Sequence, residues 1–247
     1  MVLILFLILW SSPALAVTQW CDHASVETCW TIEAGSGIVW DDKSSNAVDA
    51  DCDDGGTWSA DVPDGDDGFD GTSTYSYDFS GDDSVDGNYD PDGDSRTANT
   101  FVLWVNIDTP TSLDRIFALN NTNGRGLLQY NSSGIKPDWY GNGFDLYASL
   151  DDIPTGEWEH YAATYDETAD VARIYVNGVL KQSDTDITTQ ATDILVIGAR
   201  VAGTSEIDGR MDEFAIFSVE LTSTQINDIY ENGLVQAAAT GRTRRFF

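Results

Sequence analysis

The chain has 247 residues, of which 42 are acidic and 12 are basic, and its formal net charge is −30. A field of this sign repels nucleic-acid phosphates and anionic membrane surfaces, which argues against nucleic-acid or membrane-surface binding. The length suits one large all-β domain.

Residues 1–16 have the pattern of a secretory signal peptide. The apolar run Val2 to Trp10 is followed by Ala14-Leu-Ala16, a small-residue cleavage site. No Lys or Arg precedes the run, which departs from the usual pattern. Its nine residues are too few to span a membrane, since a span takes about 20. We therefore expect a secreted or surface-exposed protein with no membrane span in the mature chain.

Three cysteines, Cys21, Cys29 and Cys52, lie near the start of the mature chain. An oxidising compartment favours one disulfide with one cysteine left over, and the spacing leaves the pairing open. A zinc site is not expected, because His23 and His160 form no ligand-spaced cluster with the thiols. Short strands are expected at 29–32 and 38–40.

An acidic block runs from Asp49 to Asp94, with sixteen Asp and no Lys or Arg. Within it, Thr74 to Ser80 alternates aromatic with polar residues and is predicted to be a half-buried strand. The rest is predicted to be an acidic loop without regular structure, because like charges repel and Gly and Pro favour turns.

Part of this block has the spacing of the first half of a calcium loop. The candidate ligands are Asn88, Asp90, Asp92 and Asp94, whose oxygens suit a hard cation. The closing Glu is absent, since Asn99 stands where it would fall. We predict calcium as a cofactor here, and the alternative is an acidic loop that is only solvated.

Further strands follow at short spacing. Phe101 to Ile107 is almost continuously apolar and is expected to be central. The others are expected at 115–119, 127–130, 144–150 and 194–197. Many short strands separated by turn signals indicate a β-sandwich.

Residues 156–183 predict three strands folded back on one another. In the first, Trp158 to Tyr165, alternate side chains point to opposite faces. Residues 166–170 turn the chain into a strand at 171–176. Asn177-Gly178 then predicts a two-residue type I′ turn into a third strand that begins at Val179.

One helix is expected near the end of the domain. Thr222 and Gln225 form a capping box, Leu221 and Ile226 occupy the staple positions, and Gly233 closes the helix. We expect this helix to pack across the sandwich as a lid. The segment 236–247 is basic and predicted to be a flexible tail, or alternatively to dock on the acidic body.

Three blocks resemble the laminin-G-like jelly roll, a branch of the concanavalin A-like lectin/glucanase superfamily. They are Trp158 to Gly178, with its Trp-x-His, Thr-Tyr-Asp and Tyr-Val-Asn-Gly motifs, then Ile207 to Phe217, and more weakly 31–41 with 77–81. The resemblance implies an antiparallel jelly-roll β-sandwich from about residue 26 to 234, within a domain at 17–235, with one short C-terminal helix.

The same superfamily includes laminarinase-type hydrolases, whose strand carries Glu-x-Asp-x-Glu or Glu-x-Asp-x-x-Glu. Glu206 and Asp208 begin such a motif, but Arg210 and Met211 stand where the second Glu would fall. A catalytic carboxylate pair is therefore missing, and we expect no catalytic residues. His160 is expected to be a core histidine.

The expected function is binding or adhesion at a glycan or glycoprotein surface. Trp139 and Tyr140, in an expected loop at 136–143, are the candidates for stacking on sugar rings, and the alternative is that Trp139 only plugs the sandwich edge. A structural part of a surface appendage or viral fibre is the second hypothesis, and a glycoside hydrolase is less favoured.

Overall fold

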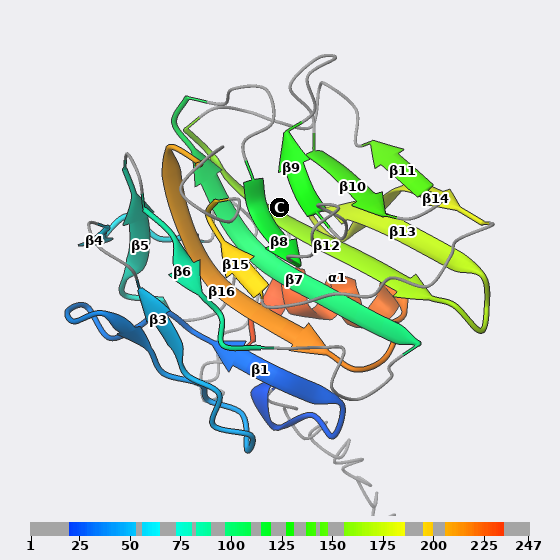
Figure 1. Ribbon diagram of the computed structural model, residues 1–247, viewed down its shortest axis with the longest axis horizontal. Helices are drawn as coiled ribbons and strands as arrows, with labels where there is room; N and C mark the ends of the chain where they lie inside the picture. Colours follow the sequence, from blue (N-terminus) through cyan, green and yellow to red (C-terminus); the bar gives the residue numbers. More distant parts are fainter. Residues whose placement is uncertain are drawn as a thin grey trace, which may run out of the picture.

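The computed structural model describes residues 20–52, 56–64, 73–80, 83–89, 97–109, 115–119, 156–185, 195–199 and 206–234, and the backbone of 127–130, 137–141 and 144–147. Two antiparallel sheets pack face to face, and one helix lies behind them in the view of Figure 1. The expected all-β jelly-roll sandwich is confirmed.

The described part of the first sheet has eight strands. From edge to edge the order is β14 (Val179–Asp184), β13 (Val171–Val176), β12 (Trp158–Asp166), β7 (Ala98–Ile107), β16 (Gly209–Phe217), β5 (Ser76–Phe79) and β4 (Thr57–Ser59), and β1 (Val26–Trp30) pairs with β16. As expected, β7 is central, and its residues from 99 to 107 are buried.

The second sheet also has eight strands among the described residues. Its order is β11 (Phe144–Tyr147), β10 (Pro137–Gly141), β9 (Leu127–Tyr130), β8 (Arg115–Leu119), β15 (Leu195–Ile197), β6 (Val85–Asp86), β3 (Ala50–Cys52) and β2 (Val39–Trp40). The prediction of a loop at 136–143 is wrong, because β10 occupies most of this range and pairs with β9 and β11.

The sandwich interior is filled by alternate residues of both sheets. In β12, Tyr161 and Ala163 belong to this core, whereas Ala162 belongs to a second cluster on the opposite face. The turn that follows β13 is as predicted, since Asn177 and Gly178 have φ values of 49° and 72°.

The second cluster lies under helix α1 (Ser223–Asn232). The capping box of Thr222 and Gln225 is present, and Ile226 and Ile229 are buried. They pack on the outer face of the first sheet, with residues that include Val102, Ala162, Tyr175, Ala215 and Phe217. The helix therefore packs across one face of the sandwich, as expected.

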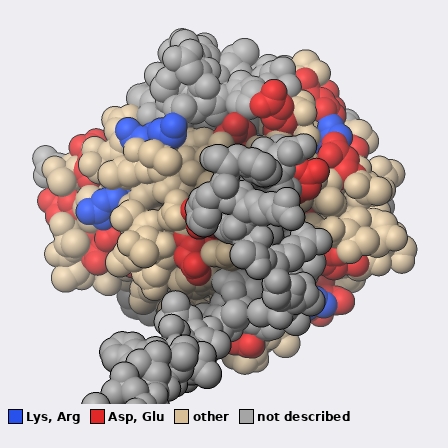
Figure 2. Space-filling model, turned by 180° about the vertical axis from the view of Figure 1, so that it is seen from behind, with Lys and Arg blue, Asp and Glu red and all other residues tan. Residues whose placement is uncertain are grey.

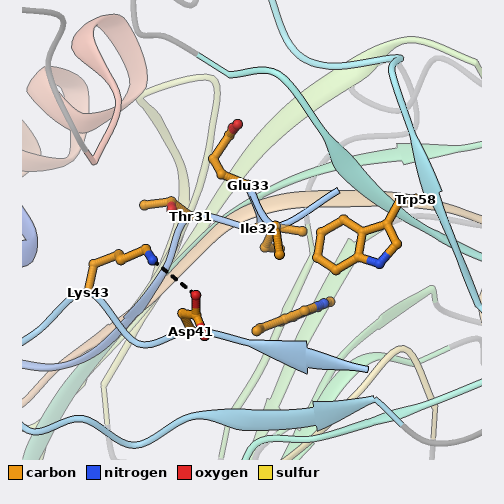
Figure 3. Close-up of a pocket in the computed structure, with 8 residues that line it drawn as sticks. Thr31, Ile32, Glu33, Asp41, Lys43 and Trp58 are labelled. Carbon is orange, nitrogen blue, oxygen red and sulfur yellow. Dashed lines mark hydrogen bonds and ion pairs between the residues drawn. The ribbon is translucent and has the colours of Figure 1, made fainter. Parts of the chain in front are cut away.

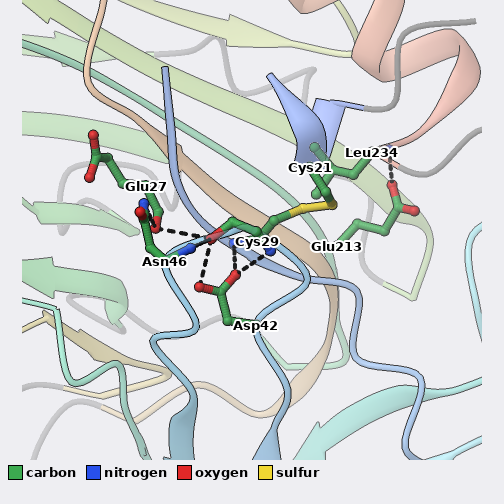
Figure 4. The surroundings of a disulfide bond; sticks show 8 residues. Cys21, Glu27, Cys29, Asp42, Asn46, Glu213 and Leu234 are labelled. Carbon is green, nitrogen blue, oxygen red and sulfur yellow. Dashed lines mark hydrogen bonds between the residues drawn. A yellow bond between two sulfur atoms is a disulfide. The ribbon is translucent and has the colours of Figure 1, made fainter. Parts of the chain in front are cut away.

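The two ends of the described chain meet beside this helix. A short 3-10 helix, η1 (Trp20–Asp22), begins where the Trp20 N–H donates to the Leu234 carbonyl at 2.9 Å. Cys21 and Cys29 form the disulfide, with their Cα atoms 5.4 Å apart (Figure 4). Cys52, the cysteine outside this bond, is buried. One disulfide with one cysteine left over was the expectation.

The prediction that the acidic block lacks strands outside 74–80 is wrong. Three short strands, β3, β4 and β6, lie in it, in addition to β5. In β3 the acid takes the exposed position, because Ala50 and Cys52 are buried and Asp51 points to solvent. A charged residue in an alternating strand is compatible with a buried face opposite it.

No helix in the described residues is long and apolar enough to cross a membrane.

Candidate functional site

A shallow pocket lies at the edge of the sandwich beside Trp58 (Figure 3). Its lining comes from the chain after β1, from the end of β2 and the segment that follows it, and from β4. The lining residues are Thr31, Ile32, Glu33, Ala34, Trp40, Asp41, Lys43 and Trp58. The pocket thus combines an indole with hydroxyl, carboxylate and ammonium groups.

Trp58 is held in place by the pairing of β4 with β5. It stands opposite Tyr77 in register, and the two rings meet edge to face with centroids 5.6 Å apart. Its indole N–H donates to the Gly37 carbonyl at 3.1 Å. Because the side chain is half-buried and packs on the core, the ring is fixed before any ligand arrives.

Asp41 and Lys43 form the charged rim of the pocket. The Lys43 ammonium lies 3.4 Å from the Asp41 carboxylate, and both side chains are well exposed, at 45% and 62%. The residue between them, Asp42, accepts a hydrogen bond from the backbone N–H of Cys29 (Figure 4). It also accepts from the backbone N–H groups of Ser44 and Val48. This network fixes the backbone that carries the ion pair.

The side chain of Glu33 is held by hydrogen bonds from the two residues at 73 and 74, which precede β5. Its carboxylate accepts from the Thr74 N–H at 3.0 Å and from the Ser73 hydroxyl at 2.7 Å. The same hydroxyl contacts the carboxyl of Asp212, which is buried. Burial and the neighbouring Glu213 raise the pKa of Asp212, and burial raises the pKa of Glu213 to about 8.

The pocket is too small to enclose a sugar. Its space of about 10 Å³ is on the scale of one water molecule. It offers instead a fixed surface on which an exposed ring could rest, with hydrogen-bonding groups at its border. Outside the lining, Tyr75 is 37% exposed, and its ring packs against Gly35, the residue after Ala34.

The predicted sugar-binding residues Trp139 and Tyr140 lie in β10. Trp139 pairs with Leu128 on one side and with Leu146 on the other. Their side chains lie outside the described residues, so stacking by these two residues stays a prediction.

Most of the predicted calcium ligands lie outside the described residues. These are Asp90, Asp92 and Asp94. Asn88 is described, with φ 46°, and its amide donates to the Asp51 carboxylate at 3.0 Å. Within the described ranges, no three His, Cys, Asp or Glu side chains are grouped to hold a metal ion. The calcium site stays a prediction.

Glu206 and Asp208 do not lie along a strand as a hydrolase motif would require. Strand β16 begins at Gly209, after both of them, and Asp208 is exposed. His160 is a core histidine, as expected: it is buried, and its ring lies edge to face with Trp104 at 5.3 Å. Burial lowers the pKa of His160 to about 3, so it is neutral at physiological pH.

Sequence reasoning missed the pocket beside Trp58. A lone tryptophan within an acidic, glycine-rich block is a signal that could have drawn attention to it. The rest of the pocket could not be foreseen, because residues 31–43 and Trp58 are brought together by the tertiary fold, with β2 and β4 in different sheets.

The chain resembles several solved structures in fold. Domain 4 of a GH43 extracellular arabinanase from Geobacillus stearothermophilus, in complex with arabinotriose, has a TM-score of 0.61 at 18% identity, covering 86% of this chain and 98% of that domain. A Trypanosoma rangeli sialidase has a TM-score of 0.61 at 17% identity, with 85% and 33% covered. The binding domain of botulinum neurotoxin serotype D has a TM-score of 0.60 at 18% identity, with 84% and 51% covered.

This chain thus spans nearly all of the arabinanase domain, about half of the toxin binding domain and about a third of the sialidase. Identities this low show a shared fold alone. No curated protein matches the chain. A laminin-G-type family model described as the concanavalin A-like lectin/glucanases superfamily matches residues 79–227, which is more than half of the sequence. The chain therefore belongs to the concanavalin A-like lectin/glucanases superfamily.

Proposed function

We propose that this chain is a secreted, non-catalytic carbohydrate-binding module. The observation that carries the proposal is the pocket beside Trp58, where a fixed indole borders hydroxyl, carboxylate and ammonium groups. Sugar recognition combines an apolar ring face with a few placed polar groups. The arabinanase domain in complex with arabinotriose supports a sugar-binding role for this fold.

The proposal that the chain is not a hydrolase rests on the positions of three acidic residues. Glu206 and Asp208 precede β16, and the second Glu of the hydrolase motif is absent. Asp212 is buried and bonded to Ser73, so it is not presented to a substrate. These residues therefore do not form the pair of carboxylates along one strand that the hydrolase motif uses.

The test is a glycan array probed with the purified mature chain and two variants. We expect Trp58→Ala to weaken binding of any ligand found by more than tenfold, and Val179→Ala, an exposed site on β14, to leave it unchanged. Since Trp58 also packs on the core, Lys43→Ala at the exposed rim is a second variant, expected to weaken binding without altering the unfolding midpoint.

A matched experiment separates this pocket from the predicted contact at β10. Trp139→Ala combined with Tyr140→Ala tests stacking by that pair. If this variant loses binding and both pocket variants keep it, the site lies on β10 and not beside Trp58. If the wild-type chain binds no glycan with or without calcium, the carbohydrate-binding proposal fails.

A further inference from the structure

The basic side chains of the described residues are already engaged. There are five: Lys43, Arg115, Arg173, Lys181 and Arg210. Arg173 pairs with Glu220, Arg210 pairs with Asp61 and Asp108, and Lys43 pairs with Asp41. Arg115 is buried, and Lys181 has its own interaction. The described surface therefore presents no spare cation.

In the pocket beside Trp58, too, the basic side chain is already paired with an acidic one. Its one cation, Lys43, is matched by Asp41 at 3.4 Å, and Glu33 adds a further carboxylate. The surface of the molecule is acidic as well: on the face seen in Figure 2, groups of Asp and Glu side chains are scattered between the other residues, with only a few Lys and Arg among them. An anionic ligand would meet negative charge both at the pocket and on approach.

We propose that the Lys43–Asp41 ion pair is the specificity determinant of this pocket and restricts it to glycans without carboxylate or sulfate groups. This inference rests on the proposed carbohydrate-binding function. Sugar hydroxyls both donate and accept hydrogen bonds, so a neutral sugar can donate to Asp41 or Glu33 and accept from Lys43. The carboxylate of a sialylated sugar, or the sulfate of a sulfated one, only accepts hydrogen bonds, so it can use the ammonium alone, and the adjacent carboxylates of Asp41 and Glu33 repel it.

The net negative charge of the whole chain also disfavours anionic glycans. A net charge of −30 lowers the encounter rate and affinity of anions at low ionic strength, and salt screens this effect. The preference for neutral over anionic glycans should therefore have a long-range electrostatic part that salt removes. It should also have a local part, set by the ion pair, that a single substitution changes.

The experiment uses an array of matched glycans in which one core is present in neutral, sialylated and sulfated forms. We expect the wild-type chain to bind the neutral form at least about tenfold more tightly at low salt, and the ratio to narrow in 0.5 M sodium chloride. Asp41→Asn leaves Lys43 unpaired, and should raise relative binding of the anionic forms about two- to fivefold, the scale of an exposed ion pair. Lys43→Gln should lower relative binding of the anionic forms.

Both substitutions lie at exposed side chains, so neither should change folding, and the unfolding midpoint checks this. Tight binding of a sialylated or sulfated form by the wild-type chain would overturn the inference while leaving the carbohydrate-binding function intact. The same holds if neutral glycans bind but Asp41→Asn leaves the neutral-to-anionic ratio unchanged. Absence of binding to every glycan would overturn both proposals.

Discussion

The carboxylate of Asp42 organises the turn that carries the pocket rim. One oxygen accepts from the N–H groups of Cys29 and Ser44, each at 2.8 Å. The other accepts from the Ser44 hydroxyl at 2.7 Å and the Val48 N–H at 2.8 Å. An ionised carboxylate accepts at both oxygens, whereas an amide has one acceptor and turns its NH₂ group toward donors.

We therefore expect Asp42→Asn to lower the free energy of unfolding by about 2–3 kcal/mol, since buried N–H groups lose their acceptor. The neighbouring Asp41→Asn removes the same charge from an exposed side chain and should change stability by less than about 0.5 kcal/mol. Urea unfolding of both variants measures the difference. Equal stability of the two would show that the four contacts of Asp42 contribute nothing specific.

Two buried residues should give opposite pH dependences. For Glu213, burial raises the pKa from 4.5 to about 8 while its Oε2 accepts from the Leu234 N–H at 2.9 Å. Between these pH values the folded chain keeps a proton that the unfolded chain releases. The contribution of Glu213 to stability is thus complete below about pH 4.5 and is lost as the pH rises toward 8.

Glu213→Gln keeps an oxygen for the Leu234 N–H and removes the titration. We expect the variant to gain stability relative to the wild type between pH 5 and pH 8. The slope is at most about 1.4 kcal/mol per pH unit, because one proton is involved. Unfolding curves at several pH values measure this. A difference between the two proteins that does not change with pH would contradict the assignment.

His160 titrates in the other direction, because burial lowers its pKa from 6.5 to about 3. Between these pH values the unfolded chain binds a proton that the folded chain excludes, so stability is lost as the pH falls below 6.5. His160→Phe keeps a ring beside Trp104 and Tyr230, and should be more stable relative to the wild type at pH 4.5 than at pH 8. An advantage of equal size at both pH values would refute this.

At the scale of elements, the β3–β6 pair brings two acids together. Asp51 stands directly opposite Asp86 in register, and like charges at such positions repel. Asp86→Asn retains an oxygen that accepts from the Asn88 N–H, a contact of 2.9 Å. We expect this variant to be more stable by about 0.2–1 kcal/mol at low salt, and the gain to vanish in 0.5 M sodium chloride.

The matched control is Asp184→Asn on β14. Asp184 also accepts from a neighbouring N–H, that of Thr185 at 2.8 Å, but it stands opposite Ala172 and not opposite an acid. Both variants lose one charge, so the comparison isolates the cross-strand repulsion. Thermal unfolding at two salt concentrations is sufficient, and equal gains in the two variants would assign the effect to net charge alone.

Elements with a local signal could be predicted from the sequence, and those assembled by distant pairing could not. Asn177-Gly178 and the Thr222–Gln225 capping box specify their turn and helix within a few residues, and both are present. The strands β3 and β6 are two or three residues long, and each exists because the other segment lies beside it. The pocket beside Trp58 likewise depends on distant segments, since β2 and β4 contribute to its lining from different sheets.

At the scale of the whole molecule, part of the acidity is structural. Several Asp carboxylates accept backbone N–H groups in turns and at strand ends, where short acceptors stabilise the bend. The residues are Asp42, Asp49, Asp83, Asp86, Asp166 and Asp184. Asp83 is buried although it lies in the acidic block. The acidic composition therefore reflects turn formation as well as solvation.

The remaining repulsion motivates the calcium prediction. Sixteen Asp fall within residues 49–94 with no Lys or Arg among them. Two unit charges about 4 Å apart repel by about 1 kcal/mol in bulk water and by several times that at a protein surface. A divalent ion removes the repulsion among its own ligands. It also stabilises the folded chain by mass action, by about 2.7 kcal/mol at one hundred times its dissociation constant.

We expect millimolar calcium to raise the melting temperature more than sodium chloride of the same ionic strength. Replacing Asp90 and Asp92 together by Asn should abolish this calcium-specific part and leave the general salt effect. The control is Asp22→Asn with Asp208→Asn, which removes two charges at exposed positions outside the block and should keep the response to calcium. Equal shifts with calcium and sodium in the wild-type chain would mean that the block is an acidic surface that salt only screens.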